Sequence, residues 1–307
     1  MDISPDFFTM DLLSAILDEA GWKNDLLTRD AIHESWGFQF PCEKSGGFHI
    51  ITQGSCYARF LGKQFELKKG DILFIAKGLT HELLSDPKAK VVEIQRFYEK
   101  REHQTKNSLP VTTFVSVRYE IPEKPQHPFF LELPDHILMR AEDIAAHHSL
   151  NTATTMISQE LESGFGSDLI LQRLTDILLY YVIRHWLTKN PSVSPGWVMA
   201  FRDNHVLLAL QSMHKNPSAD WTLESLAKNI GISRAGLANK FKEVLNIPPM
   251  EYLTRIRMDK ARDLFMKEDT NLEEVALAVG YSSAFAFSKA YKRLFGVSPA
   301  REWKKTG

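Results

Sequence analysis

The chain carries the same sequence pattern twice near its C-terminal end. Residues 223–253 align with residues 272–303, and the second copy has one extra residue just after its turn. The paired positions include Leu223 with Leu272, Gly231 with Gly280, Leu237 with Phe287, Phe241 with Tyr291 and Pro249 with Pro299. A repeated design folds into the same small unit each time, and this limits the possible folds more than any other feature.

Each copy is predicted to form two helices joined by a glycine turn. Apolar residues at helical spacing predict a short first helix, and Gly231 or Gly280 then permits a turn with positive φ. Ser233 in the first copy, and Ser282 or Ser283 in the second, is suited to cap the second helix.

The second helix of each copy has an apolar inner face and a basic outer face. The outer residues are Arg234, Asn239 and Lys240 in the first copy and Ser288, Lys289 and Lys292 in the second. This is the helix-turn-helix design, whose second helix enters the major groove of DNA. The alternative is an ordinary helical hairpin with a solvated charged face, and the tandem repeat argues against it.

One long helix is predicted between the two copies. Pro248 and Pro249 suit a helix start, and no helix breaker follows before Asp269. A helix of about 18 residues forms a rod of roughly 27 Å, which suits two helices in successive major grooves about 34 Å apart. The basic residues on this rod either meet phosphates or pair with Asp259 and Asp263; they are Arg255, Arg257, Lys260 and Arg262.

Basic residues are concentrated in this same part of the chain. Residues 200–307 hold 17 Lys and Arg against 12 Asp and Glu, whereas the other 199 residues hold 20 against 26. A basic C-terminal third is expected when only one part of a chain meets nucleic acid. The two cysteines fit no metal or disulfide pattern, and the polar residues within 169–187 exclude a membrane span. We therefore expect a cytoplasmic protein with reduced thiols.

The N-terminal part has the pattern of an antiparallel β-domain. From about residue 30 to 120, short β-branched and aromatic runs alternate with Gly, Asp and Pro. Four prolines predict that residues 121–135 form a linker without regular structure. Helical periodicity is predicted from about 137 to 187, a second hinge over 189–197, and helices again beyond it.

Residues 200–303 resemble the AraC/XylS-type DNA-binding domain. The match is dense over WTLESLAKNIGISRAGLANKFKEVLNIPP and again over EEVALAVGYSSAFAFSKAYKRLFGVSP. The resemblance implies a transcription regulator whose two helix-turn-helix units bind one asymmetric DNA site. By position in the family pattern, the residues that face the bases are Arg234, Ala235, Ala238 and Asn239, and then Ala284, Phe285, Ser288 and Lys289. Because many of these are small or apolar, we expect modest specificity and a strong salt dependence.

Residues 6–100 resemble the cupin-type sensor domain of a subset of these regulators. The pattern G-D-x-L-x-x-A-x-G-x-x-H, from Gly70 to His81, is similar to the second cupin motif. Cupins are small jelly-roll barrels, and Trp36, His49 and His81 are candidates for lining an effector pocket. A catalytic metal needs about three protein ligands, so two histidines without a carboxylate predict neither a metal site nor an enzyme.

These features predict an α+β protein in three parts. Residues 1–120 form an antiparallel, jelly-roll, cupin-like sensor barrel, and residues 121–195 form a linker and a helical dimerisation segment. Residues 196–307 form an all-α DNA-binding domain with two helix-turn-helix units joined by a long helix. The segment 169–187 is apolar around more than one face, which favours a homodimer over burial within one chain.

The expected function is transcription regulation by sequence-specific binding to double-stranded promoter or operator DNA. A small-molecule effector or dimerisation would control it, with RNA polymerase as a further partner and no cofactor. Two alternatives remain at this point: a cupin enzyme fused to a DNA-binding tail, and an architectural DNA binder that needs no ligand.

Overall fold

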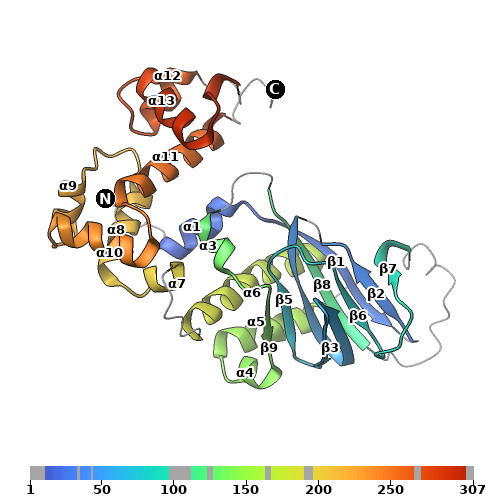
Figure 1. Ribbon diagram of the computed structural model, residues 1–307. Coiled ribbons are helices and arrows are strands. Elements are labelled where there is room, and N and C mark those ends of the chain that lie inside the picture. Colours follow the sequence, from blue (N-terminus) through green and yellow to red (C-terminus); the bar gives the residue numbers. More distant parts are fainter. Residues whose placement is uncertain are drawn as a thin grey trace, which may run out of the picture. The chain divides into compact units, whose positions relative to one another are not determined.

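The chain divides into two compact units with a mixed α+β architecture (Figure 1). The computed structural model describes residues 11–32, 35–42, 44–96, 112–122, 127–162, 167–189, 196–265 and 271–301. One unit, Leu17–Pro191, holds the described strands. The other comprises Met1–Ile16 and Ser192–Gly307, and its described part is helical. Helix α1 (Leu12–Ala20) begins after Asp11 and ends before Gly21.

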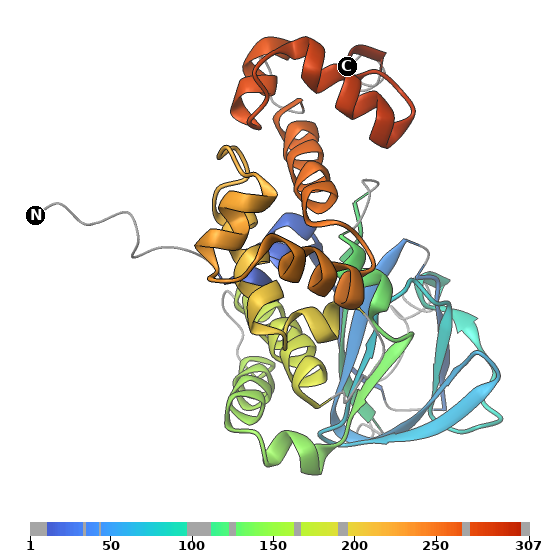
Figure 2. The same cartoon turned by 60° about the vertical axis from the view of Figure 1, so that its left-hand side comes forward.

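The unit Leu17–Pro191 is built on one curled, mostly antiparallel sheet (Figures 1 and 2). Its strands are β1 (Lys23–Ile32), β2 (Gly37–Phe40), β3 (Ser45–Phe60), β4 (Lys63–Lys68), β5 (Ile72–Ile75), β6 (His81–Leu84), β7 (Val92–Glu93), β8 (Thr112–Glu120) and β9 (His136–Met139). The main path runs β1-β8-β3-β6-β2-β7, while β4 and β5 also pair with β3, and β9 pairs with β5. The antiparallel β-domain predicted from the sequence is confirmed at this level.

Strand β3 makes the sheet curl. The first half of this 16-residue strand pairs with β5 and β8, whereas its second half pairs with β4 and β6. A register shift between Ile51 and Gln53 precedes Gly54, which has a φ of 73°, and such irregularities bend a strand. The curl encloses an apolar cluster that includes Phe38 and Phe40, so the sheet forms a half-barrel with its own core.

A short helix occupies part of the linker predicted at 121–135. Helix α3 (Pro128–Glu132) begins at a proline, which the first helical turn tolerates because its amide has no intrahelical partner. The His127 ring accepts a hydrogen bond from the Phe129 amide at 3.2 Å, and Phe129 is buried. The prediction of irregular structure was therefore wrong over α3; residues 123–126 lie outside the described part of the chain.

Strand β9 corrects the predicted start of the helical region. Residues 136–139 pair with β5, with His136 opposite Ile75 and Met139 opposite Ile72. Their burial alternates, as a strand with one covered face requires. Four alternating residues are too few to stand out against a helical pattern, and the available edge of β5 decides the strand.

Helices α4 (Ala141–Ala145), α5 (His148–Glu160) and α6 (Ser167–Lys189) follow β9. Asn24 of β1 donates hydrogen bonds to the Gln172 carbonyl at 2.8 Å and to the Asp176 carboxylate at 2.6 Å, which fixes α6 beside the sheet (Figure 1).

Helix α6 has one buried and one exposed apolar face. The buried face consists of Leu171, Leu174, Leu178 and Val182. The exposed face consists of Leu169, Ile170, Ile177 and Tyr180, which are at least 45% exposed. Within the described residues, α6 therefore keeps one apolar face uncovered.

The helical unit contains the doubled sequence pattern. Its described helices are α7 (Trp197–Ala200), α8 (Asn204–Lys215), α9 (Leu223–Asn229), α10 (Arg234–Leu245), α11 (Pro249–Phe265), α12 (Leu272–Ala278) and α13 (Ala284–Phe295). Helix α11 leads from the group α8–α10 to α12 and α13 (Figure 1). Across both units, the described helices include none that combines the length and the hydropathy of a bilayer span.

Candidate nucleic-acid interface

The first helix pair, α9 and α10, has the predicted turn and cap. Gly231 lies between the helices with a φ of 78°, a region that glycine adopts without strain. The Ser233 hydroxyl accepts a hydrogen bond from the Gly236 amide at 3.0 Å and so caps α10. Thr222 and Ser225 cap the start of α9 through reciprocal hydrogen bonds. Local residue types therefore explain where both helices begin.

The second helix pair, α12 and α13, repeats these contacts. Gly280 has a φ of 83°, and the Ser283 hydroxyl accepts a hydrogen bond from the Ala286 amide at 3.2 Å. Asn271 caps α12 by accepting a hydrogen bond from the Glu274 amide at 2.9 Å. Of the two serines that could cap α13, the fold uses Ser283.

The inward faces of α10 and α13 are apolar, as predicted. Leu237 and Phe241 on α10 are buried, and so are Phe287 and Tyr291 on α13. The α13 residues pack in a cluster with residues of α11 and α12, including Met258. Each pair is therefore oriented by its core, which leaves the opposite face of α10 and of α13 for other contacts.

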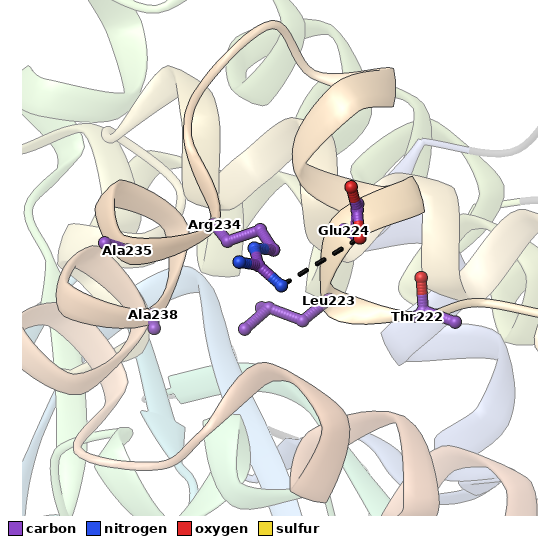
Figure 3. Close-up of a pocket in the computed structure, with 6 residues that line it drawn as sticks. All are labelled: Thr222, Leu223, Glu224, Arg234, Ala235 and Ala238. Atoms are coloured by element: carbon purple, nitrogen blue, oxygen red, sulfur yellow. Dashed lines mark ion pairs between the residues drawn. The ribbon is translucent and has the colours of Figure 1, made fainter.

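The outward face of α10 borders a pocket of about 500 Å³ (Figure 3). The lining residues are Thr222, Leu223, Glu224, Arg234, Ala235 and Ala238, so three of the predicted base-facing residues lie together there. Arg234 Nη1 lies 3.9 Å from Glu224 Oε2, and both side chains are more than two-thirds exposed. Such an exposed ion pair contributes little free energy, so Arg234 can exchange this partner for another. Asn239 is also exposed.

The outward face of α13 is led by an aromatic ring. Phe285 is 81% exposed, and Lys289 and Lys292 are exposed on the following turns. Ala284 and Ser288 are partly exposed. All of the α13 residues predicted to face the bases therefore reach the surface.

A glutamate stands at the same position in both helix pairs. Glu224 of α9 and Glu273 of α12 are aligned in the repeat, and each reaches the first residue of the next helix. Glu224 pairs with the Arg234 side chain, whereas Glu273 accepts a hydrogen bond from the Ala284 amide at 3.3 Å. Sequence reasoning missed this role, although the repeat alignment contained the signal.

Two basic residues of the predicted interface region bond within the helical unit. Lys240, predicted to contact DNA, donates a hydrogen bond to the Asp203 carboxylate, which caps α8. Arg257 of α11 donates to the carbonyls of Pro217 and Ala219 at 2.7 and 2.8 Å. These partners lie outside α11. The sequence analysis considered only phosphates and the acidic residues of the same helix as partners, so it did not predict them.

Arg262 of α11 is also turned toward the helical core. Its Nε donates to the Tyr291 hydroxyl at 3.2 Å, and its guanidinium lies 3.4 Å from the centroid of the Phe295 ring. A stacked arginine of this kind holds two helices together through cation–π attraction. It joins α11 to α13. Residues 266–269 of the predicted rod lie beyond the described end of α11.

Two of the three candidate effector residues, His49 and His81, meet inside the half-barrel. His49 and His81 are buried, with their Nε2 atoms 2.6 Å apart. The Nδ1 of His81 lies 2.8 Å from the Leu79 carbonyl, which can only accept, so His81 carries its proton on Nδ1. Its Nε2 therefore accepts from His49 Nε2–H, and the Ser116 hydroxyl donates to His49 Nδ1 at 2.6 Å. One chain of hydrogen bonds thus satisfies both neutral rings.

The third candidate, Trp36, belongs to the apolar cluster of the half-barrel together with Phe38 and Phe40, and it has an unsatisfied donor. Its ring is 96% buried and stacks on Phe38, with centroids 4.8 Å apart. Its indole Nε1 is buried without a hydrogen-bond partner among the described residues. Those residues also contain no group of three or more His, Cys, Asp or Glu side chains arranged to hold a metal ion.

Two protein-family models match this chain, and together they define its class. A model described as "Cupin" matches residues 11–188, and a model described as "Helix-turn-helix domain" matches residues 226–305. The chain is thus a DNA-binding protein with an N-terminal cupin domain. More particularly, it belongs to the cupin-containing AraC-type helix-turn-helix transcription regulators.

Curated relatives match over nearly the whole chain. An AraC-like transcription regulator of Streptomyces lividans is 28% identical over 269 residues, which cover 86% of this chain and 88% of the relative. The regulator MtrA of Neisseria gonorrhoeae is 27% identical over 310 residues, covering 97% and 99%. An HTH-type transcriptional regulator of Haemophilus influenzae is 24% identical over 298 residues, covering 95% and 98%. These relatives are named as regulators and not as enzymes, in agreement with the sequence prediction.

Proposed function

We propose that α9–α10 and α12–α13 are two helix-turn-helix units that place α10 and α13 in successive major grooves of one DNA duplex. The observation that supports this is the repeated geometry, in which the same glycine turn and serine cap precede an outward polar or basic face. Helix α11 has 17 residues and is therefore about 26 Å long. A rod of that length between two helix pairs is compatible with grooves about 34 Å apart.

The proposed DNA contacts are those predicted from the sequence. They are Arg234, Ala235, Ala238, Asn239 and Lys240 on α10, and Ala284, Phe285, Ser288, Lys289 and Lys292 on α13. Arg234 and Asn239 have the geometry for bidentate contacts to guanine and adenine, while Lys289 and Lys292 suit phosphates. Lys240 contributes only after it releases Asp203, with which it is paired in the free protein.

The N-terminal part is proposed to be the regulatory part. In functional terms, residues 1–120 are a jelly-roll sensor, residues 121–195 a connecting and dimerisation segment, and residues 196–307 the DNA-binding domain. Among the described residues the buried Trp36 Nε1 has no hydrogen-bond partner, which supports an effector site in the half-barrel that also holds His49 and His81, because a ligand acceptor would satisfy this donor. The effector is thus expected to be an apolar small molecule with a hydrogen-bond acceptor.

A homodimer is proposed to form through α6. Leu169, Ile170 and Ile177 leave an apolar face exposed on a helix whose other face is buried. A second copy would cover this face, and the dimer would then carry two DNA-binding domains. RNA polymerase is the proposed further partner of the DNA-bound dimer. Such a regulator acts in the cytoplasm, where its operator lies.

The test of DNA binding compares full-length variants on operator and random DNA. Arg234→Ala and Asn239→Ala are each expected to reduce the preference for operator by about 5- to 100-fold, because each removes a bidentate base contact. Lys63→Ala in the sheet unit removes the same charge as Arg234→Ala and is expected to leave the preference unchanged. Protection footprinting should show two contacted turns per protomer. A single protected turn, or equal losses in all three variants, would contradict the proposal.

A further inference from the structure

Phe285 is the most exposed large apolar side chain among the described residues, at 81%. It is the second residue of α13, so it lies at the end of the helix that the proposed function places in the groove. A single exposed apolar side chain needs no explanation in general. Its position at the leading end of α13 is what distinguishes it.

Three of the first four backbone amides of α13 are already engaged. Among the first four amides of α13, Ala284 donates to Glu273, Ala286 to the Ser283 hydroxyl, and Phe287 to the Ser283 carbonyl. The side chains of Ala284 and Ala286 carry no polar atom. The first turn of α13 therefore offers an aromatic ring and methyl groups to a partner, with few free hydrogen-bond donors.

The first turn of α10 differs at the aligned positions. Arg234 corresponds to Ala284, and Ala235 to Phe285. Arg234 presents a guanidinium whose ion pair with Glu224 is exposed. The two helices therefore present different chemistry, with hydrogen-bond donors at the start of α10 and apolar surface at the start of α13.

The major groove has one apolar group that such a surface can recognise, namely the C5-methyl group of thymine. The exposed lysines 289 and 292 on the next turns of α13 attract phosphate, which favours DNA over an apolar protein surface as the partner of this face. We propose that Phe285 reads a pyrimidine C5-methyl group, so that the half-site bound by α13 is selected for thymine at one or two positions. This inference rests on the proposed function and specifies what α13 recognises.

A methylated cytosine carries the same group at the same place in the groove. Phe285 should therefore accept 5-methylcytosine in place of thymine, and methylation of cytosine at that position would strengthen binding. Removing one contacted methyl group is expected to weaken binding roughly three- to fivefold. This is the change in Kd that corresponds to the transfer free energy of one buried carbon.

The test starts from DNA selected by the full-length protein out of a random duplex library. Footprinting locates two protected turns, and the turn weakened by Arg234→Ala is assigned to α10, which leaves the other for α13. Each thymine of the α13 half is then replaced by deoxyuridine, which removes only the methyl group. One or two replacements should weaken binding three- to fivefold, and 5-methylcytosine should bind more tightly than cytosine at the same positions.

Variants then assign the effect to the ring. Phe285→Ala should weaken binding to thymine-containing DNA and abolish the difference between thymine and uracil, while Phe285→Leu should keep part of that difference. Leu208→Ala, which truncates another exposed apolar residue of the helical unit, should keep all of it. The wild-type comparison of thymine with uracil needs no variant, so it stands even if Phe285→Ala fails to fold.

The outcomes separate this inference from the proposed function. If the second turn is not protected, the proposal of two groove-binding helices fails. If it is protected but uracil replaces every thymine without loss, or if Phe285→Ala retains the discrimination, then the methyl-reading role of Phe285 is wrong while the two-helix proposal stands.

Discussion

His49 and His81 lie against each other in the half-barrel, and burial lowers the pKa of both imidazoles. The pKa of His81 falls to about 4. That of His49 falls well below its usual 6.5, through burial first and through the neighbouring His81 second. The hydrogen bonds to Ser116 and Leu79 satisfy the neutral rings. A proton added to either ring would put an uncompensated charge in an apolar core.

The pair should make the sheet unit sensitive to mild acid. Below the usual pKa of about 6.5, both histidines are protonated in the unfolded chain but stay neutral in the folded chain. The free energy of unfolding is therefore highest above that pH and decreases as the pH falls toward 4. Two such groups should cost about 2 kcal/mol between pH 7 and pH 5.5. Urea unfolding can be followed by pulsed labelling of Cys42 and Cys56, which are both buried in this unit.

A variant tests whether the histidines cause this loss. His49→Gln with His81→Gln should be less stable at pH 7 but should show little of the decrease between pH 7 and pH 5.5. If the double variant loses as much stability on acidification as the natural chain, other groups are responsible.

Helices α10 and α13 differ by one glycine, and this difference has a predictable effect on stability. Gly236 in α10 corresponds to Ala286 in α13, and each amide donates to a capping serine. A Cβ at Gly236 would meet only Ser233 Oγ, at 3.1 Å. Because Ala286 occupies the same position beside Ser283, that contact can be accommodated.

We therefore expect Gly236→Ala to stabilise the helical unit by about 0.5–1 kcal/mol, the difference in helix propensity between the two residues. The reverse change, Ala286→Gly, should destabilise it by a similar amount. Thermal unfolding monitored by circular dichroism at 222 nm measures both. If Gly236→Ala instead lowers the stability, then the Ser233 side chain cannot shift by the few tenths of an ångström needed to make room for the new Cβ. The comparison of Ser233 with Ser283 would then be wrong.

At the level of elements, sequence patterns predicted the long and repeated features well. The glycine turns, the serine caps and the buried faces of α10 and α13 follow from residue types within a few positions of each other, and these predictions were confirmed. Helix α3 and strand β9 could not be predicted in this way. They are four or five residues long, and they form because Phe129 finds a buried site and β5 has a free edge.

At the scale of the whole molecule, the segment that precedes the first helix pair contacts the turn of the second pair at Gly280. A Cβ there would lie 2.6 Å from the Ser218 carbonyl oxygen and 2.8 Å from its Cα. Arg257 reinforces the junction, since it bonds the carbonyls of Pro217 and Ala219 and lies over the Tyr281 ring. The segment that precedes α9 is thereby packed against the turn of the second pair, and we expect this contact to help set the separation of α10 and α13.

Substitution of the two turn glycines should therefore have unequal effects. In Gly231→Ala the new Cβ has no atom within 4 Å, so the only cost is the strain of a positive φ. This strain should lower the free energy of unfolding by about 1–2 kcal/mol. Gly280→Ala bears the same strain and also forces the Ser218 backbone away, so it should lose about 3 kcal/mol or more. Thermal unfolding should rank them in this order.

The same pair of variants tests how the junction serves DNA binding. Gly280→Ala should keep protection of the α10 half-site and lose that of the α13 half-site, whereas Gly231→Ala should keep both if it remains folded. Equal stability and equal footprints for the two variants would show that the contact between Gly280 and Ser218 does not set the separation of the helices.

The sequence by itself determined the class of protein, the repeated helix pairs and the face of each helix that turns inward. These follow from local physics, because glycine, serine and apolar spacing act within a single turn or helix. Tertiary structure alone decided which polar groups are already engaged, such as Lys240 with Asp203, Glu273 with the Ala284 amide, and His49 with His81. Those partners are brought together by the packing of separate elements, and the spacing of residues along the chain does not predict such contacts.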